Sequence, residues 1–256
     1  MTDHLQAARL EFRARRYSYA VQFAQYALAC DPDDVEALTI LGMSHLHLSE
    51  FACGVEALEH LSLLRPLDDA CRIELAIAYG CCGKKQLSRD LLMMLATSGR
   101  MDASQLLRIA TGLESIEEPY LAMEACRQAG KHAPESPDVH YQMGYYAQIC
   151  GHPSSVSEAL IRHAIGLDPH NLHFRIGLAS LLIRLGRKSE AIRVIDHFVP
   201  DRLAEVTCVC CLHRIANLFF DCDDLERAKM CAARAASLQD DQADAIEAAS
   251  KEKVIS

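Results

Sequence analysis

Apolar and small residues recur along this 256-residue chain with a period close to 34 positions. Each period opens with an apolar residue followed by a small one, at Ala7-Ala8, Leu41-Gly42, Leu75-Ala76, Ile109-Ala110, Met143-Gly144, Leu178-Ala179 and Ile215-Ala216. Twelve or thirteen positions later comes another small residue, at Ala20, Gly54, Ser88, Ala122, Ser157, Ala191 and Ala228. A fixed period of this length predicts an array of stacked, similar supersecondary units.

The spacing within one period predicts two helices joined by a tight turn. Large apolar residues follow one another at the i, i+3, i+4 spacing of amphipathic helices. Two helices can cross closely only where their contact carries little bulk, which explains the paired small positions such as Gly42 and Gly54. Proline cannot continue a helix, and it closes four of the periods, at Pro32, Pro66, Pro134 and Pro169.

This pattern resembles that of tetratricopeptide repeat (TPR) proteins over nearly the whole chain. The resemblance implies an all-α fold, a right-handed α-solenoid (superhelix) of helix-turn-helix repeats, because one repeat alone cannot bury its apolar face. We expect about seven repeats, at 2–33, 34–67, 68–101, 102–135, 136–170, 171–203 and 208–241. The polar, alanine-rich segment 242–256 is expected to be a C-terminal capping helix and tail, because terminal repeats need a polar outer face.

Composition and charge narrow the function and the location. The formal net charge is −9, which argues against a nucleic-acid partner or an anionic lipid surface. No apolar run approaches the about 18 residues of a membrane span, so we expect no membrane insertion. The start, Met1-Thr2-Asp3, does not resemble a signal peptide. We therefore expect a cytoplasmic protein.

The chain has twelve cysteines, a smaller share than the about 8–10% that marks disulfide scaffolds. Six of them lie among alanines and leucines in predicted helices, where they are expected to be small hydrophobic residues in a reducing compartment: Cys30, Cys53, Cys71, Cys126, Cys150 and Cys231.

In TPR proteins the first helix of each repeat lines a concave face that holds peptides. The resemblance therefore implies a peptide-binding set at the matching positions: Arg9, Phe12, Met43, His47, Ile77, Arg108, Tyr141, Tyr145, Ile183, Arg184, Asn217 and Phe220. Much of the predicted lining is apolar, and tyrosine and methionine are typical of interfaces. We expect an adaptor or chaperone-like scaffold that binds an apolar or amphipathic peptide segment of an unidentified protein partner. The alternative is that these residues pack against one another and leave little groove open.

The sequence gives little indication of a catalytic or a metal site. No nucleophile lies near a base and an orienting acid, so we expect a non-catalytic protein without a cofactor. Cys208 and Cys211 lie three positions apart and would share a helix face, but the remaining spacings match no zinc finger. We therefore predict no metal site there. Two other hypotheses stay open: a self-associating subunit of a larger complex, which would be a homo-oligomer, and a metal-binding regulator that uses the C-terminal cysteines.

Overall fold

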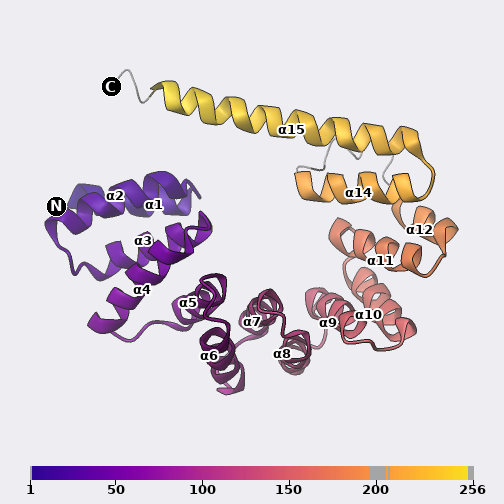
Figure 1. The fold of residues 1–256 in the computed structure, drawn as a ribbon, viewed down its shortest axis with the longest axis horizontal. Coiled ribbons are helices and arrows are strands. Elements are labelled where there is room, and N and C mark those ends of the chain that lie inside the picture. Colours follow the sequence, from indigo (N-terminus) through magenta and orange to yellow (C-terminus); the bar gives the residue numbers. More distant parts are fainter. Residues whose placement is uncertain (1, 197–205, 207, 253–256) are drawn as a thin grey trace. The chain divides into compact units, whose positions relative to one another are not determined.

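The structure, a computed structural model, describes residues 2–196, 206 and 208–252, and these residues form fourteen α-helices and no β-strand (Figure 1). Two compact units divide the chain, and the first ends at Gly151. Unit 1 contains α1 (Thr2–Arg13), α2 (Tyr17–Cys30), α3 (Val35–His47), α4 (Phe51–Leu64), α5 (Asp69–Cys81), α6 (Lys85–Thr97), α7 (Ala103–Ser115), α8 (Pro119–His132) and α9 (Pro137–Ile149). Unit 2 contains α10 (Ser154–Leu167), α11 (Leu172–Arg184), α12 (Lys188–Ile195), α14 (Val209–Asp221) and α15 (Leu225–Glu252).

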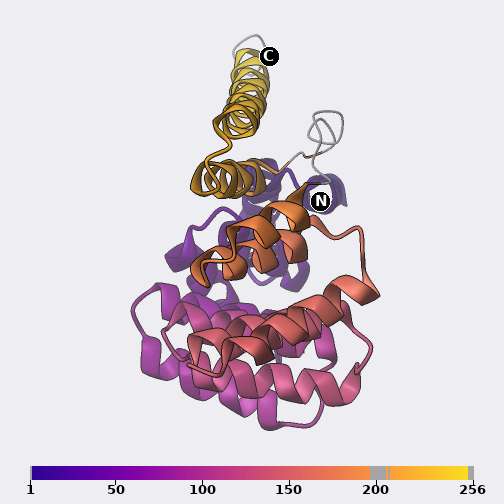
Figure 2. The same ribbon diagram turned by 90° about the vertical axis from the view of Figure 1, so that its right-hand side faces the viewer.

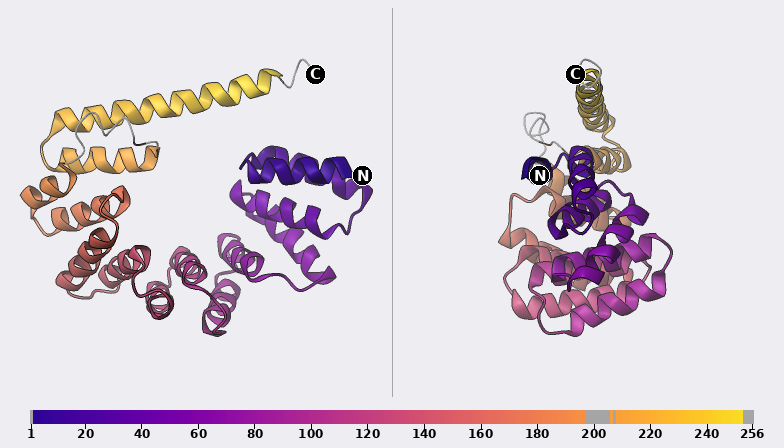
Figure 3. Two further views of the ribbon diagram at one scale, coloured as in Figure 1. Left: turned by 180° about the vertical axis from the view of Figure 1, so that it is seen from behind. Right: turned by 90° about the vertical axis from the view of Figure 1, so that its left-hand side faces the viewer.

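Consecutive helices pack in pairs, which confirms the predicted all-α solenoid fold. In unit 1 the first helices of the pairs also contact one another, α1 with α3, α3 with α5, and α5 with α7. The helices α5 and α7 lie on the inner side of unit 1, while α6 and α8 lie on the outer side (Figure 1). The left panel of Figure 3 shows the same two rows from behind. In unit 2, α11 packs on α12 and α14 on α15, and Figure 2 shows these helices from another side.

Each tight turn inside a helix pair contains one residue in the left-handed backbone region. These residues are Arg15, Ser49, Gly83, Glu117, Gly151, Gly186 and Asp223, so they follow the period of the sequence. In six of the seven turns, the residue after it donates its N–H to a carbonyl five positions back, as Lys84 does to Tyr79 at 2.8 Å. This geometry ends the first helix and reverses the chain.

Aspartates at the same period begin three of the first helices. The carboxylates of Asp34, Asp68 and Asp102 each accept a hydrogen bond at 2.8 Å from a backbone N–H of the first turn of α3, α5 and α7. N-caps of this kind satisfy amides that would otherwise lack a partner. They fix where each first helix starts, and so which of its residues face the next repeat.

The small residues lie where the two helices of a pair touch. A Cβ atom added to Gly54 of α4 would lie 2.3 Å from Cδ2 of Leu46 and 3.2 Å from the carbonyl oxygen of Gly42 on α3. One added to Gly42 would lie 2.8 Å from Leu58. The helices can approach this closely because neither position carries a side chain.

The C-terminal end of the described chain is one long helix. Residues 242–252, which belong to the predicted cap, continue α15 without a break after the predicted repeat boundary at 241. The segments 197–203 and 253–256, which belong to the predicted sixth repeat and to the tail, lie outside the described residues. The seven repeats as a division of the chain, and the role of its end as a cap, stay predictions.

The close approach at Gly54 can be tested with alanine. Gly54→Ala should lower the free energy of unfolding by about 1 kcal/mol, because overpacking exceeds the gain in helix propensity. Gly130→Ala on α8 is the matched control. Its new Cβ meets Val139 at 3.5 Å, an ordinary contact. This control should be neutral or stabilising by up to about 1 kcal/mol. Urea unfolding followed by circular dichroism measures both, and equal effects of the two substitutions would contradict the packing account.

Candidate functional site

Two arginine–glutamate pairs join first helices of neighbouring repeats in unit 1. Nε and Nη2 of Arg9 on α1 each donate to a carboxylate oxygen of Glu36 on α3, both at 2.6 Å. Arg108 on α7 makes the same two bonds at 2.6 Å to Glu74 on α5. Two-point pairing fixes the direction of the guanidinium plane. The predicted site residues Arg9 and Arg108 are therefore oriented, and their charges are locally neutralised.

The pKa values of these groups follow from the pairing. The hydrogen bond from Arg9 holds the pKa of Glu36 below its ordinary value. The hydrogen bond to Glu74 raises the pKa of Arg108, with burial acting in the opposite direction. Both pairs are half-exposed, so solvent screens them and they contribute little to stability. Their main effect is on the shape and polarity of the surface.

Three rings from three helices meet at the start of unit 1. Phe12 of α1 lies 5.7 Å from Tyr17 of α2 and 6.1 Å from His47 of α3, measured between ring centroids. Tyr17 and His47 stack at 4.2 Å. The structure thus brings together the predicted residues Phe12 and His47, and adds Tyr17, which the sequence analysis did not select.

A second aromatic group lies between α7 and α9. Tyr145 donates a hydrogen bond to Glu114 Oε1 at 2.5 Å, and Tyr146 donates to the other oxygen at 3.0 Å. The Tyr145 ring is 38% exposed, whereas Tyr146 is buried. Burial, followed by the charge of Glu114, raises the pKa of Tyr146. Glu114 therefore holds Tyr145 at the surface by the hydroxyl end.

Two of the predicted contact residues are in the core. Ile77 and Tyr141 are each only 8% exposed. Ile77 lies against α7, since a Cβ added to Gly112 would be 2.6 Å from its Cγ1. Sequence spacing alone placed these two side chains on the surface, but close stacking of α5 on α7 covers Ile77. Met43 is half-buried and contacts a core cluster.

The predicted residues of unit 2 are more exposed. On α11, Ile183 is half-buried and Arg184 exposed; on α14, Asn217 is exposed and the Phe220 ring is 63% exposed. The two helices pack on each other. The side chains of all four predicted residues therefore reach the surface of unit 2.

Two cavities lie beside the second helices of unit 1, away from the predicted residues. One, of about 390 Å³, is lined by α4, α5 and α6, with Leu75, Tyr79 and Met94 among its walls. The other, of about 580 Å³, is lined by α2, α3 and α4, with His45 and His60. The sequence analysis missed both. The segment Leu61–Leu64 has three leucines around Ser62, which lines the first cavity, and Leu63 is 85% exposed. An exposed leucine outside the repeat pattern is the sequence signal that could have pointed to this surface.

Cysteines divide into buried and exposed groups. Burial raises the pKa of Cys71 and Cys126 to about 12, and Cys231 is also buried, as small hydrophobic residues would be. Cys150 is half-buried, whereas Cys30 and Cys53 are exposed, so the same interpretation is wrong for these two. Cys53 faces the cavity of about 580 Å³ and not the core.

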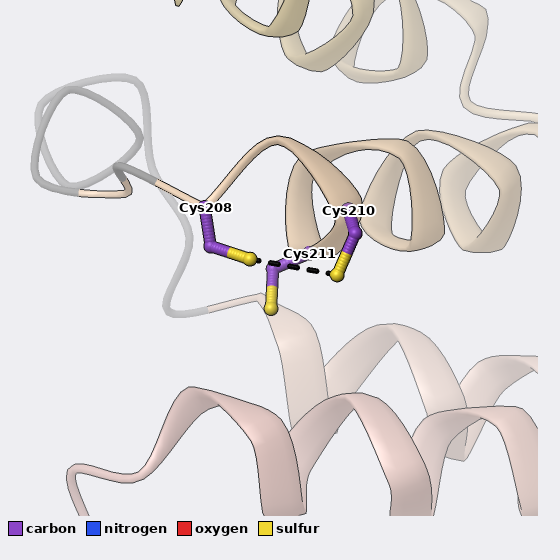
Figure 4. A group of neighbouring side chains, drawn as sticks. All are labelled: Cys208, Cys210 and Cys211. Atoms are coloured by element: carbon purple, nitrogen blue, oxygen red, sulfur yellow. Dashed lines mark hydrogen bonds between the residues drawn. The ribbon is translucent and has the colours of Figure 1, made fainter. Parts of the chain in front are cut away.

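Three cysteines converge at the beginning of α14. The Sγ atoms of Cys208, Cys210 and Cys211 lie within 4.8 Å of one another (Figure 4). Cys222 and Cys231, near them in sequence, are not part of this group. The nearby backbone amide of Cys211 is the main cause that lowers the pKa of Cys208, while burial raises the pKa of Cys211 to about 12. The prediction of no metal site rested on sequence spacing, which does not show this convergence.

The comparisons with solved structures show the fold. A tetratricopeptide repeat protein from Parabacteroides merdae matches with a TM-score of 0.70 and 13% identity, over 93% of this chain and 92% of that chain. A MamA structure from Desulfovibrio magneticus matches with a TM-score of 0.52 and 14% identity, over 64% of this chain and 93% of that one. A further MamA structure has a TM-score of 0.53 and 17% identity, over 63% of this chain and 94% of its own.

These likenesses and the fourteen described helices show a tetratricopeptide-type repeat fold. The predicted resemblance is thereby confirmed for the fold. No protein-family model matches the sequence, and the comparison with curated proteins gives no match.

Among the residues that the structure describes, none of the helices combines the length and the hydrophobicity that crossing a membrane requires.

The different positions of the two tyrosines can be measured. Tyr141→Ala removes a buried ring and should lower the free energy of unfolding by about 3 kcal/mol. Tyr145→Ala removes a half-exposed ring and one hydrogen bond, and should cost about 1 kcal/mol or less. Thermal and urea unfolding of the two variants test this order. A reversed order would contradict the assignment of Tyr141 to the core and Tyr145 to the surface.

Proposed function

We propose that this chain is a non-catalytic protein-interaction module that binds an apolar or amphipathic peptide segment on the inner side of unit 1. Its role would be that of an adaptor or a chaperone-like scaffold. One observation carries the proposal: four of the five first helices of unit 1, α1, α3, α7 and α9, present aromatic, methionine, histidine or arginine side chains that are not fully buried. We call this set the inner-face row: Arg9, Phe12, Met43, His47, Arg108 and Tyr145.

The chemistry of the inner-face row supports an amphipathic ligand over an acidic one. Aromatic residues, methionine and arginine are enriched at the centres of interfaces, where they exclude water. Both arginines already hold a glutamate, so an acidic peptide would have to displace Glu36 or Glu74. Apolar side chains of a ligand can instead pack on the Phe12, Met43 and Tyr145 surfaces without breaking an ion pair.

The spacing of the first helices sets the ligand's own pattern. Packed helices lie about 8–10 Å apart, so equivalent side chains of neighbouring repeats form rungs at that distance. A peptide in the polyproline II conformation has three residues per turn and rises about 3.1 Å per residue, so it would place an anchor on each rung every third residue. A helical peptide rises about 1.5 Å per residue and returns to the same face after seven residues, so it would place an anchor on each rung every seventh residue.

The predicted residues of unit 2 form a second, smaller part of the proposal. Ile183 and Arg184 on α11 and Asn217 and Phe220 on α14 would contact a peptide at that unit, with the 63%-exposed Phe220 ring as anchor. Ile77 and Tyr141 are left out of the proposed surface because they are buried. A cytoplasmic location and the absence of a cofactor remain part of the proposal on the sequence grounds given above.

Binding can be tested with peptides selected from a random displayed library against the wild-type protein. Replacing Tyr145 with alanine should weaken the selected peptides by about 30-fold, the effect of losing one central aromatic anchor. Fluorescence anisotropy with labelled peptides measures the dissociation constants. The selected sequences should carry apolar residues at every third position or at every seventh.

Tyr120→Ala is the matched control, because Tyr120 is 66% exposed on the second helix α8 of the same unit. It should change the affinity by less than about twofold, as residues outside an interface centre do. Equal losses in the two variants, or none with Tyr145→Ala, would contradict the proposal. A concentration-dependent dimer in light scattering that Tyr145→Ala dissociates would instead assign this surface to self-association.

A further inference from the structure

The first turn of α14 gathers three sulfur atoms, and this cluster belongs to unit 2, whereas the inner-face row belongs to unit 1. Cys208 is the N-cap residue of α14, and Cys210 and Cys211 are in its first turn. The Sγ atoms of Cys208 and Cys210 are 3.5 Å apart, and all three lie within 4.8 Å of one another (Figure 4). The thiols of Cys208 and Cys210 are exposed and that of Cys211 is half-buried, so solvent and ions reach the group.

The local backbone explains why the sulfur atoms meet. Cys208 has an extended conformation, with φ −90° and ψ 109°, as N-cap residues do. Its side chain therefore turns back over the first turn, toward Cys211 three positions later. This is the place where a serine or aspartate cap would accept a backbone hydrogen bond, and here a thiol occupies it.

The distances fit a thiolate-bound metal ion. A metal–sulfur bond is about 2.3 Å long, which puts the sulfur atoms of one ion about 3.8 Å apart in a tetrahedral site and about 4.0 Å apart in a trigonal one. The Cys208–Cys210 separation of 3.5 Å and the upper limit of 4.8 Å for all three pairs are compatible with this spacing after small rotations of the side chains. Soft thiolate ligands select Cu(I) and Zn(II) among the common ions.

The number of protein ligands that each ion requires decides between Cu(I) and Zn(II). A structural zinc site takes four protein ligands, whereas Cu(I) is stable with three thiolates. Within the described part of the chain, the group contains three cysteines and no histidine or carboxylate. The N-terminus of a helix also favours negative charge, so the first turn of α14 lowers the cost of bringing thiolates together.

We propose that Cys208, Cys210 and Cys211 form a three-thiolate site that binds one Cu(I) ion. Binding forms three copper–sulfur bonds and releases the protons of the thiols to solvent, with no change in the oxidation state of the metal or the sulfur.

The test is a Cu(I) titration of the full chain, without oxygen and with a phosphine reductant, in the presence of a chromogenic Cu(I) chelator that removes weakly held copper. Wild type should retain one equivalent. The variant Cys208→Ser/Cys210→Ser/Cys211→Ser should retain none. The matched control, Cys30→Ser/Cys53→Ser/Cys82→Ser, replaces three exposed cysteines elsewhere and should retain one equivalent.

A second measurement uses only the wild-type protein and so does not depend on how a variant folds. One equivalent of Cu(I) should slow alkylation of Cys208 and Cys210 by at least tenfold in peptide mass spectrometry, and leave Cys30 and Cys53 unchanged. Equal copper retention by wild type and the first variant, or equal protection of all exposed cysteines, would overturn the proposal. So would one equivalent of Zn(II) held by the same three cysteines against a zinc chelator when no Cu(I) is retained.

Discussion

The close contact between the two helices of a pair is the constraint on which the rest of this structure depends. Gly42 and Gly54 carry no side chain, and Leu46 and Leu58 fill the space that this leaves. When the helices of a pair approach so closely, the large apolar residues on either side must pack on the neighbouring pairs. The cores of unit 1 therefore run from one pair to the next, as in the cluster that joins α5, α6, α7, α8 and α9.

The same constraint decides which side chains remain for function. Each first helix packs one row of side chains against the second helix of its own pair and another row against the next pair. Only one narrow row of side chains then remains at the surface. Its occupants in unit 1 include Arg9, His47, Arg108 and Tyr145, which are held by Glu36, Tyr17, Glu74 and Glu114 from other helices. Side chains fixed in this way lose little conformational entropy when a ligand binds, which favours an interaction surface.

Much of the fold could be predicted from sequence because its cause is periodic. The small residues, the turns and the aspartate caps all recur at the same spacing, so the helix pairs follow from pattern alone. The end of the last helix could not be predicted, since residues 242–252 continue α15 without a stop signal. Alanine-rich, polar sequence is equally compatible with a continued helix and with a new one.

The candidate site was less predictable because burial depends on contacts between repeats. Ile77 and Tyr145 occupy equivalent positions in the period, yet Ile77 is covered and Tyr145 is half-exposed. Glu74 and Arg108 lie 34 positions apart, and this spacing could have revealed their pairing. The meeting of Cys208 with Cys210 and Cys211 could not be read from spacing, because it depends on the backbone conformation of the cap residue.

The central claim is that first helices, rather than second helices, carry the binding surface of unit 1. Site-specific photo-crosslinking in cells tests it most directly, with a photoreactive phenylalanine analogue at Met43 on α3 or at Met94 on α6. Met94 is 49% exposed and lies on a second helix. The account predicts a crosslinked partner from position 43 and none from position 94. Crosslinking from position 94 alone would contradict it and assign binding to the opposite side.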